Sequence, residues 1–149
     1  MRRYSRIFAW TTLFFVAGAV LFFTKAAALP YKVAWPVLLL SLATFLSRRR
    51  ELLPFGFAFL FSAAGDAVGA RGLFIPQMAF FALAHAAYVC WFLPRARRRL
   101  RAVSLAVTVP LLVFLFAAIV PEAPFPAERI GVAVYGLLIA AMLYSALQY

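Results

Sequence analysis

The chain's only aspartate, Asp66, and its only histidine, His85, lie in two consecutive apolar segments. Asp66 falls within LLPFGFAFLFSAAGDAVGA, a segment long enough to cross a bilayer. A carboxylate at membrane depth costs about 2.5–3.5 kcal/mol on insertion scales, so it is retained where it faces other helices or water. Both side chains exchange protons. We therefore predict a membrane-embedded site that carries out acid–base chemistry or proton transfer.

The composition requires a membrane environment for this site. Of the 149 residues, 67% are hydrophobic, and the mean hydropathy is +0.98. Soluble domains are about 45–50% apolar, so this chain has too few polar residues to cover a water-exposed surface. The apolar runs are continuous rather than alternating, which favours helices. We predict an all-α, polytopic transmembrane bundle that forms a single domain over residues 1–149.

The positions of the apolar segments predict about six spans. The second span is short, and an alternative start for it lies nearer Leu29. The predicted spans are Ile7–Thr24, Val33–Ser47, Leu52–Ala70, Leu73–Leu93, Ala102–Val120 and Ile130–Leu147. Short connections between them predict that neighbouring helices form antiparallel hairpins.

The charge pattern predicts the orientation of these spans. Fifteen basic and four acidic residues give a net charge of +11. The bases cluster at span ends, where they set topology and contact lipid phosphates, so we predict a lipid bilayer and no nucleic acid as partner. Eleven of them fall on one predicted side: Arg2, Arg3, Arg6, Arg48, Arg49, Arg50, Arg95, Arg97, Arg98, Arg99 and Arg101. The other side has four, Lys25, Lys32, Arg71 and Arg129. This split predicts a bacterial inner-membrane protein with both termini in the cytoplasm.

Pairing the third and fourth spans as a hairpin predicts which residues lie near Asp66. A hairpin turn near Arg71-Gly72 would place Asp66 about 8 Å from the outer end of its helix. Gln77 on the returning helix would lie at the same level, and His85 about 12 Å deeper. Gln77 is therefore the better candidate neighbour of Asp66.

Helical spacing groups the other polar and aromatic candidates. Ser62 and Asp66 are four residues apart, whereas Phe81, His85 and Tyr88 are spaced by four and three, so each set shares one helix face. We predict that Ser62, Asp66, Gln77, His85 and Tyr88 line one internal cavity, with an aromatic wall from Phe81. The single Cys90 excludes an internal disulfide, and no cluster has metal-ligand spacing. We predict no metal and no cofactor.

The segment FSAAGDAVGARGLFIPQMAFFALAHAAYVCWF resembles the signature of the YhhN-like lysoplasmalogenase family of integral membrane proteins. The tail YGLLIAAM, with Tyr135, Ile139 and Met142, is similar to a later helix of that family. The signature positions are Ser62, Gly65, Asp66, Phe74, Phe81, His85 and Tyr88. The chain departs from the pattern at Gln77, where the family has a small glycine.

The resemblance implies hydrolysis of the vinyl ether bond of a lysolipid, which releases a fatty aldehyde and a glycerophospho-base. Typical members have about eight spans and a second Ser-Asp motif, so we expect a C-terminally truncated or divergent member. Vinyl ethers hydrolyse through protonation of the β-carbon, and an embedded carboxylic acid suits that step. The resemblance therefore implies that Asp66 and His85 are catalytic. It implies substrate-binding roles for Ser62, Gln77, Phe81 and Tyr88. Two non-enzymatic alternatives are an inactive family relative and a small transporter in which Asp66 and His85 relay protons. No polar motif repeats among the three hairpins, which argues against the transporter.

Overall fold

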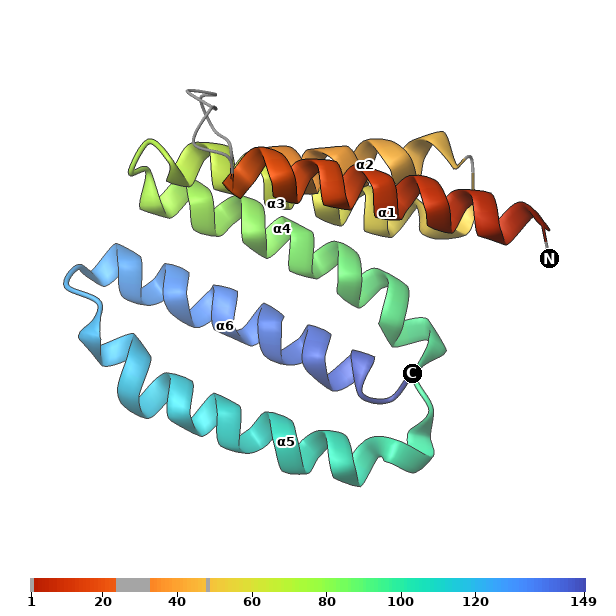
Figure 1. The fold of residues 1–149 in the computed structure, drawn as a ribbon. Helices are drawn as coiled ribbons and strands as arrows, with labels where there is room; N and C mark the ends of the chain where they lie inside the picture. Colours follow the sequence, from red (N-terminus) through yellow and green to blue (C-terminus); the bar gives the residue numbers. More distant parts are fainter. Residues whose placement is uncertain (1, 24–32, 48) are drawn as a thin grey trace.

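Six α-helices in a row make up the fold, which we describe from a computed structural model covering residues 2–23, 33–47 and 49–149 (Figure 1). The described residues contain no β-strand, and the predicted all-α bundle of six helices is confirmed. The helices are α1 (Arg2–Phe23), α2 (Trp35–Leu46), α3 (Leu53–Gly69), α4 (Phe74–Phe92), α5 (Arg101–Phe114) and α6 (Pro126–Ala146). Lys25, Lys32, Arg48 and the alternative start near Leu29 lie outside the described residues.

Short helical turns extend several of these helices. Together with them, four helices in the described part of the chain are long and apolar enough to cross a membrane. They are Arg50–Gly69, Phe74–Arg95, Arg101–Glu122 and Pro126–Ala146. The helix α2 has only 12 residues, which corresponds to about 18 Å and is shorter than a hydrocarbon core of about 30 Å. The expectation of a short second span agrees with this length.

Two helices begin earlier than the apolar pattern predicts. The first begins at Arg2 rather than near Ile7, because arginine is a good helix former and a charged first turn does not interrupt the backbone ladder. The last begins at Pro126 rather than Ile130, with proline at the first helical position, where its missing N–H is not needed. Glu128 therefore belongs to the first turn of α6.

The row does not follow chain order throughout. The contacts run α1, α2, α3, α4, α6, α5, so α6 packs between α4 and α5 (Figure 1). The expectation that every pair of neighbours in sequence forms a packed hairpin is therefore wrong for α4 and α5. Since α4 and α6 both start at the same end of the bundle, they are parallel.

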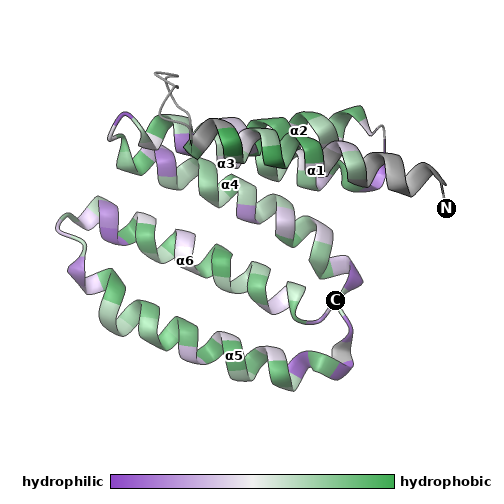
Figure 2. Ribbon diagram, in the orientation of Figure 1, coloured by the Kyte–Doolittle hydropathy of each residue, from purple (hydrophilic) through white to green (hydrophobic). Residues whose placement is uncertain are grey.

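The two ends of the row differ in composition. One end, which we call the arginine-rich end, contains both ends of the chain and the described residues Arg49, Arg50, Arg95, Arg97, Arg99 and Arg101 (Figure 1). The opposite end contains the α3–α4 turn at Gly72, whose φ of 74° suits a residue without a side chain, and the connection between α5 and α6. Hydrophilic residues gather at both ends, and few lie between them (Figure 2).

Candidate functional site

The predicted site residues come from one hairpin. Ser62 and Asp66 lie in the second half of α3, whereas Gln77 lies in the first turn of α4. The other candidates follow Gln77 along α4, and all six are partly buried: Ser62, Asp66, Gln77, Phe81, His85 and Tyr88. Their positions relative to one another depend on how α3 and α4 pair.

Two glycines of α3 set the pairing with α4. The ring of Phe81 lies against Gly65, where a Cβ atom would come within 3.2 Å of it. The amide of Gln77 occupies the space that a side chain at Gly69 would fill. Small residues allow such close approach of helices in membranes. The helices α3 and α4 therefore pack closely together on both sides of Asp66 in the sequence, at Gly65 and at Gly69.

This pairing changes the predicted levels along the membrane normal. Asp66 lies level with Phe80 and Phe81. Gln77, which was predicted to lie level with Asp66, is therefore about one helical turn away from it, toward the α3–α4 turn. His85 then lies about 7 Å from the level of Asp66, rather than about 12 Å. The prediction erred because it placed the turn symmetrically around Arg71-Gly72, whereas α4 begins only at Phe74.

Aromatic contacts show which side of the hairpin Asp66 faces. Phe55, Phe59, Ser62 and Asp66 are spaced by four, three and four residues, so they form one stripe on α3. The ring of Tyr88 lies 5.6 Å from that of Phe55 and 6.3 Å from that of Phe59, measured between centroids. The stripe that carries Asp66 therefore lies on the same side as Tyr88 of α4.

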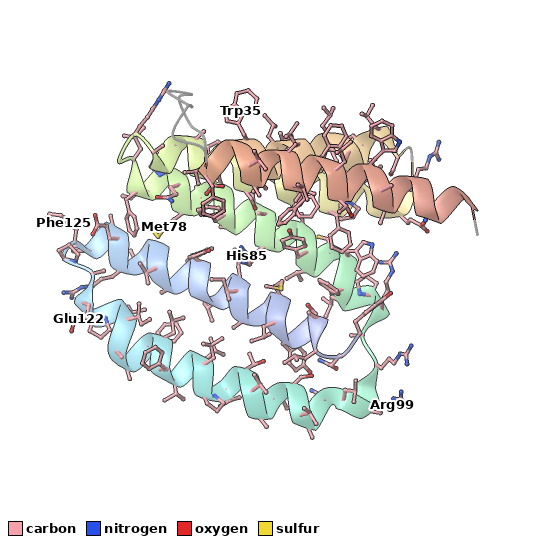
Figure 3. The ribbon with its side chains drawn as sticks, in the orientation of Figure 1. Trp35, Met78, His85, Arg99, Glu122 and Phe125 are labelled. Atoms are coloured by element: carbon pink, nitrogen blue, oxygen red, sulfur yellow. The ribbon has the colours of Figure 1, made fainter. Side chains whose placement is uncertain are left out.

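The helix α6 completes this side with Tyr135. Its ring lies 5.3 Å from the His85 ring in an edge-to-face arrangement and 6.4 Å from the Phe81 ring. The His85 side chain lies between α4 and α6 (Figure 3). We call this side of the three helices the aromatic face, and it is formed by Phe55, Phe59, Phe81, Tyr88 and Tyr135. It brings Ser62, Asp66 and His85 to one side of the bundle.

Sequence reasoning missed two members of the aromatic face. Phe55 and Phe59 were not singled out, because aromatic residues occur throughout the chain. The signal that could have found them is the stripe on α3 that they share with Ser62 and Asp66. Tyr135 was noted only through the resemblance, since nothing in the sequence predicts that α6 packs against α4.

Hydrogen bonding determines the state of the His85 ring. Its Nδ1 atom lies 2.7 Å from the carbonyl oxygen of Phe81. Because a carbonyl only accepts, Nδ1 must carry the proton and donate it to this bond. In the neutral ring, Nε2 is then left with a lone pair. The hydrogen bond thus fixes which ring nitrogen donates and leaves Nε2 without a partner among the described residues.

The Asp66 carboxylate makes no hydrogen bond or ion pair to the described residues. The salt bridge found among them joins Arg49 and Glu51 at 3.3 Å, at the arginine-rich end. No group of three His, Cys, Asp or Glu residues in the described part of the chain is arranged to hold a metal ion.

Comparison with known proteins assigns the chain to a family. The sequence profile of the YhhN family matches residues 23–149, which is most of the chain. The chain belongs to the YhhN family. The match confirms the resemblance seen in the sequence, and it contains every residue of the aromatic face. Neither a search of curated proteins nor a search of solved structures finds a match.

Proposed function

We propose that this YhhN family member is a membrane-embedded hydrolase that cleaves the vinyl ether bond of lysoplasmalogens. The observation that carries the proposal is the position of Asp66. It is partly buried within an apolar helix, has no partner among the described residues, and shares one side of the bundle with His85. An ionisable group kept at that depth without an ion pair is expected to serve a function.

The reaction needs an acid that protonates carbon. Acids withdrawn from water favour the neutral form that this step requires. Asp66 gives its proton to the β-carbon of the enol ether, and the electron pair of the carbon–carbon double bond forms the new C–H bond. An oxygen lone pair then completes an oxocarbenium ion, and the Asp66 carboxylate left beside it stabilises the positive charge.

Water completes the cycle. It attacks the oxocarbenium carbon, which is the former vinyl carbon bonded to the ether oxygen. A proton of the water passes to Asp66, directly or through Nε2 of His85. The hemiacetal that forms collapses to a fatty aldehyde and the free hydroxyl of the glycerophospho-base. One water is consumed, and Asp66 regains its proton. A single carboxyl group thus serves as acid and as base, with His85 as the second proton carrier.

The remaining site residues provide the surroundings of the substrate. The rings of Phe81, Tyr88 and Tyr135 offer apolar walls to the alkenyl chain. Ser62, one turn from Asp66, offers a hydroxyl group at the same face. Gln77 lies nearer the opposite end, where it suits contacts with the glycerol part of the lysolipid.

We also propose that the protein lies in the bacterial inner membrane with the arginine-rich end in the cytoplasm. Both termini are at that end, so both would be cytoplasmic. The larger number of arginines there supports this orientation. Reporter fusions at Arg71 and Glu122 should give the signal of the outer side. A cytoplasmic signal at both positions would overturn the orientation.

The substrate assignment is tested with purified protein in liposomes. We expect aldehyde release from a lysoplasmalogen, and none from the matched ester lysolipid or the saturated alkyl ether. Only the enol ether has a double bond whose carbon can accept the proton. A protein that is folded, as shown by circular dichroism, but releases no aldehyde would favour the non-enzymatic alternatives.

A further inference from the structure

A pocket of about 350 Å³ lies between α1 and α2, remote from the aromatic face. It is lined by Trp10, Phe14, Ala43, Leu46 and Ser47. The row of helices places α3 between α2 and α4, so this pocket is separate from the proposed active site. Its volume falls in the range of small-molecule sites, which is about 300–1,000 Å³.

The pocket is amphiphilic because of its position along α2. The apolar lining ends where α2 ends, at Leu46, and the arginine-rich end begins immediately after it. Ser47 lines the pocket, donates a hydrogen bond to the carbonyl oxygen of Thr44 at 2.6 Å, and accepts one from the backbone N–H of Arg49 at 3.4 Å. A polar rim therefore adjoins an apolar cavity.

The chain segment that follows Ser47 is basic. Arg49 is partly buried and lies 3.3 Å from Glu51, whereas the next residue, Arg50, is exposed. The first five residues of α1, at the same end of the bundle, include three further arginines in the sequence. Trp10 lines the pocket and is 58% exposed, and tryptophan is enriched at membrane–water interfaces.

We propose that this pocket binds an anionic phospholipid. Its phosphate would lie at the Arg49–Arg50 turn, and the first part of one acyl chain would lie against Trp10, Phe14 and Ala43. Basic residues beside membrane helices attract lipids with a net negative charge more strongly than zwitterionic lipids. The pocket offers that charge together with an apolar cavity, which a purely charged surface does not.

A second groove on α2 provides an internal contrast. It has about 380 Å³, lies between α2 and α3 at the other end of α2, and contains Trp35. Its other lining residues are alanines and leucines, with no hydroxyl group among them. The two tryptophans therefore report on two cavities of similar size and different polarity.

The test uses tryptophan quenching by brominated lipids in phosphatidylcholine vesicles. The variant Trp35→Phe/Trp91→Phe retains Trp10, and Trp10→Phe/Trp91→Phe retains Trp35. We expect brominated phosphatidylglycerol to quench Trp10 with an apparent affinity about fivefold or more above that of brominated phosphatidylcholine. Trp35 should be quenched equally by both lipids. Equal quenching of Trp10 by the two lipids would overturn the proposal and indicate a groove for any lipid.

A matched pair of charge variants separates this pocket from the basic surface as a whole. Arg49→Gln/Arg50→Gln should lower the preference for the anionic lipid by about fivefold or more, so that little preference remains. Arg99→Gln/Arg101→Gln removes the same charge at the same end of the bundle but at the far edge of the row, and it should leave the preference unchanged. An equal loss in both pairs would contradict a defined site.

A second measurement covers the case in which the tryptophan variants do not fold. Native mass spectrometry of the unmodified protein should show retained phosphatidylglycerol in excess over phosphatidylcholine from an equimolar mixture. The Arg49→Gln/Arg50→Gln variant should lose that excess. An unmodified protein that retains both lipids equally would overturn the proposal. Aldehyde release is not expected to change, so the two proposals can fail independently.

Discussion

Two apolar hairpins of similar length, α3–α4 and α5–α6, are built differently. The α3–α4 hairpin brings Asp66 and His85 to membrane depth, and its helices approach closely at Gly65 and Gly69. The α5 helix instead packs on α6 alone, at the edge of the row (Figure 1). Its side chains at membrane depth are almost all aliphatic or aromatic.

The few polar groups of α5 do not form a site. Ser104 donates its hydroxyl proton to the carbonyl oxygen of Leu100 in its own helix at 2.9 Å. The buried hydroxyl of Thr108 has no hydrogen-bond partner among the described residues. Both are uncharged, so a membrane accommodates them at small cost. Hydropathy alone therefore does not separate the two hairpins, and close glycine contacts do not either, because Gly136 of α6 lies against Leu115 after α5. The ionisable groups at membrane depth do.

Enlarging Gly65 should destabilise the α3–α4 hairpin. In Gly65→Leu the new side chain would overlap the Phe81 ring, which is itself packed against Tyr135. Overpacking of this kind costs about 1–3 kcal/mol in the free energy of unfolding. Thermal unfolding in detergent should show a clear decrease of the midpoint. Ala106→Leu on the exposed side of α5 should change stability by less than about 0.5 kcal/mol. Equal midpoints in the two variants would remove the distinction between the hairpins.

His85 should affect turnover more than stability. His85→Gln retains an N–H group for the Phe81 carbonyl but removes the lone pair of Nε2. We expect kcat for aldehyde release to fall by up to about 10²-fold, the lower limit for a general acid or base. His85→Ala should lose as much activity, and should also unfold at a lower temperature because the ring contact with Tyr135 is lost. If His85→Gln turns over at the rate of the unmodified protein, His85 is a packing residue.

The smallest effects concern hydroxyl groups. Ser41 is buried and donates a hydrogen bond from α2 to the carbonyl oxygen of Gly56 in α3 at 2.8 Å. Ser41→Ala should reduce the free energy of unfolding by about 0.6–1 kcal/mol. Thr108→Val should leave it unchanged or raise it slightly, because an unpaired hydroxyl is replaced by a methyl group of similar size. Thermal midpoints of the two variants give the comparison, and a larger loss in Thr108→Val would show that this hydroxyl has a partner.

Much of the fold was predictable because apolar segments and chain breaks are local properties. The third and fourth helices agree with their predicted bounds to one residue at each end. The order of the helices in the row was not predictable. The apolar helix surfaces are similar in composition, so nothing in the sequence indicates that α6 packs against α4. For the same reason, the place of Tyr135 beside His85 could not be predicted from spacing.

The sequence singles out the ionisable candidates of the site, but not their geometry or their aromatic neighbours Phe55 and Phe59. Asp66 and His85 stand out because ionisable residues are rare in apolar segments. Their relative depth depends on where α4 begins, and three residues between Ala70 and Phe74 determine it. Helical spacing predicts that Phe55 and Phe59 share one stripe with Asp66. It does not predict that Tyr88 of α4 packs against that stripe.

The most direct test of the account replaces one carboxyl group at a time. Asp66→Asn preserves the shape of the side chain and removes its ionisable proton, so kcat for aldehyde release from a lysoplasmalogen should fall by about 10²–10⁴-fold. Glu122→Gln, at the exposed end of the α5 segment, replaces a carboxyl group by an amide in the same way and should leave kcat unchanged. Both variants should retain the helical circular dichroism of the unmodified protein. Turnover near that of the unmodified protein in Asp66→Asn would contradict the proposal that Asp66 protonates the enol ether.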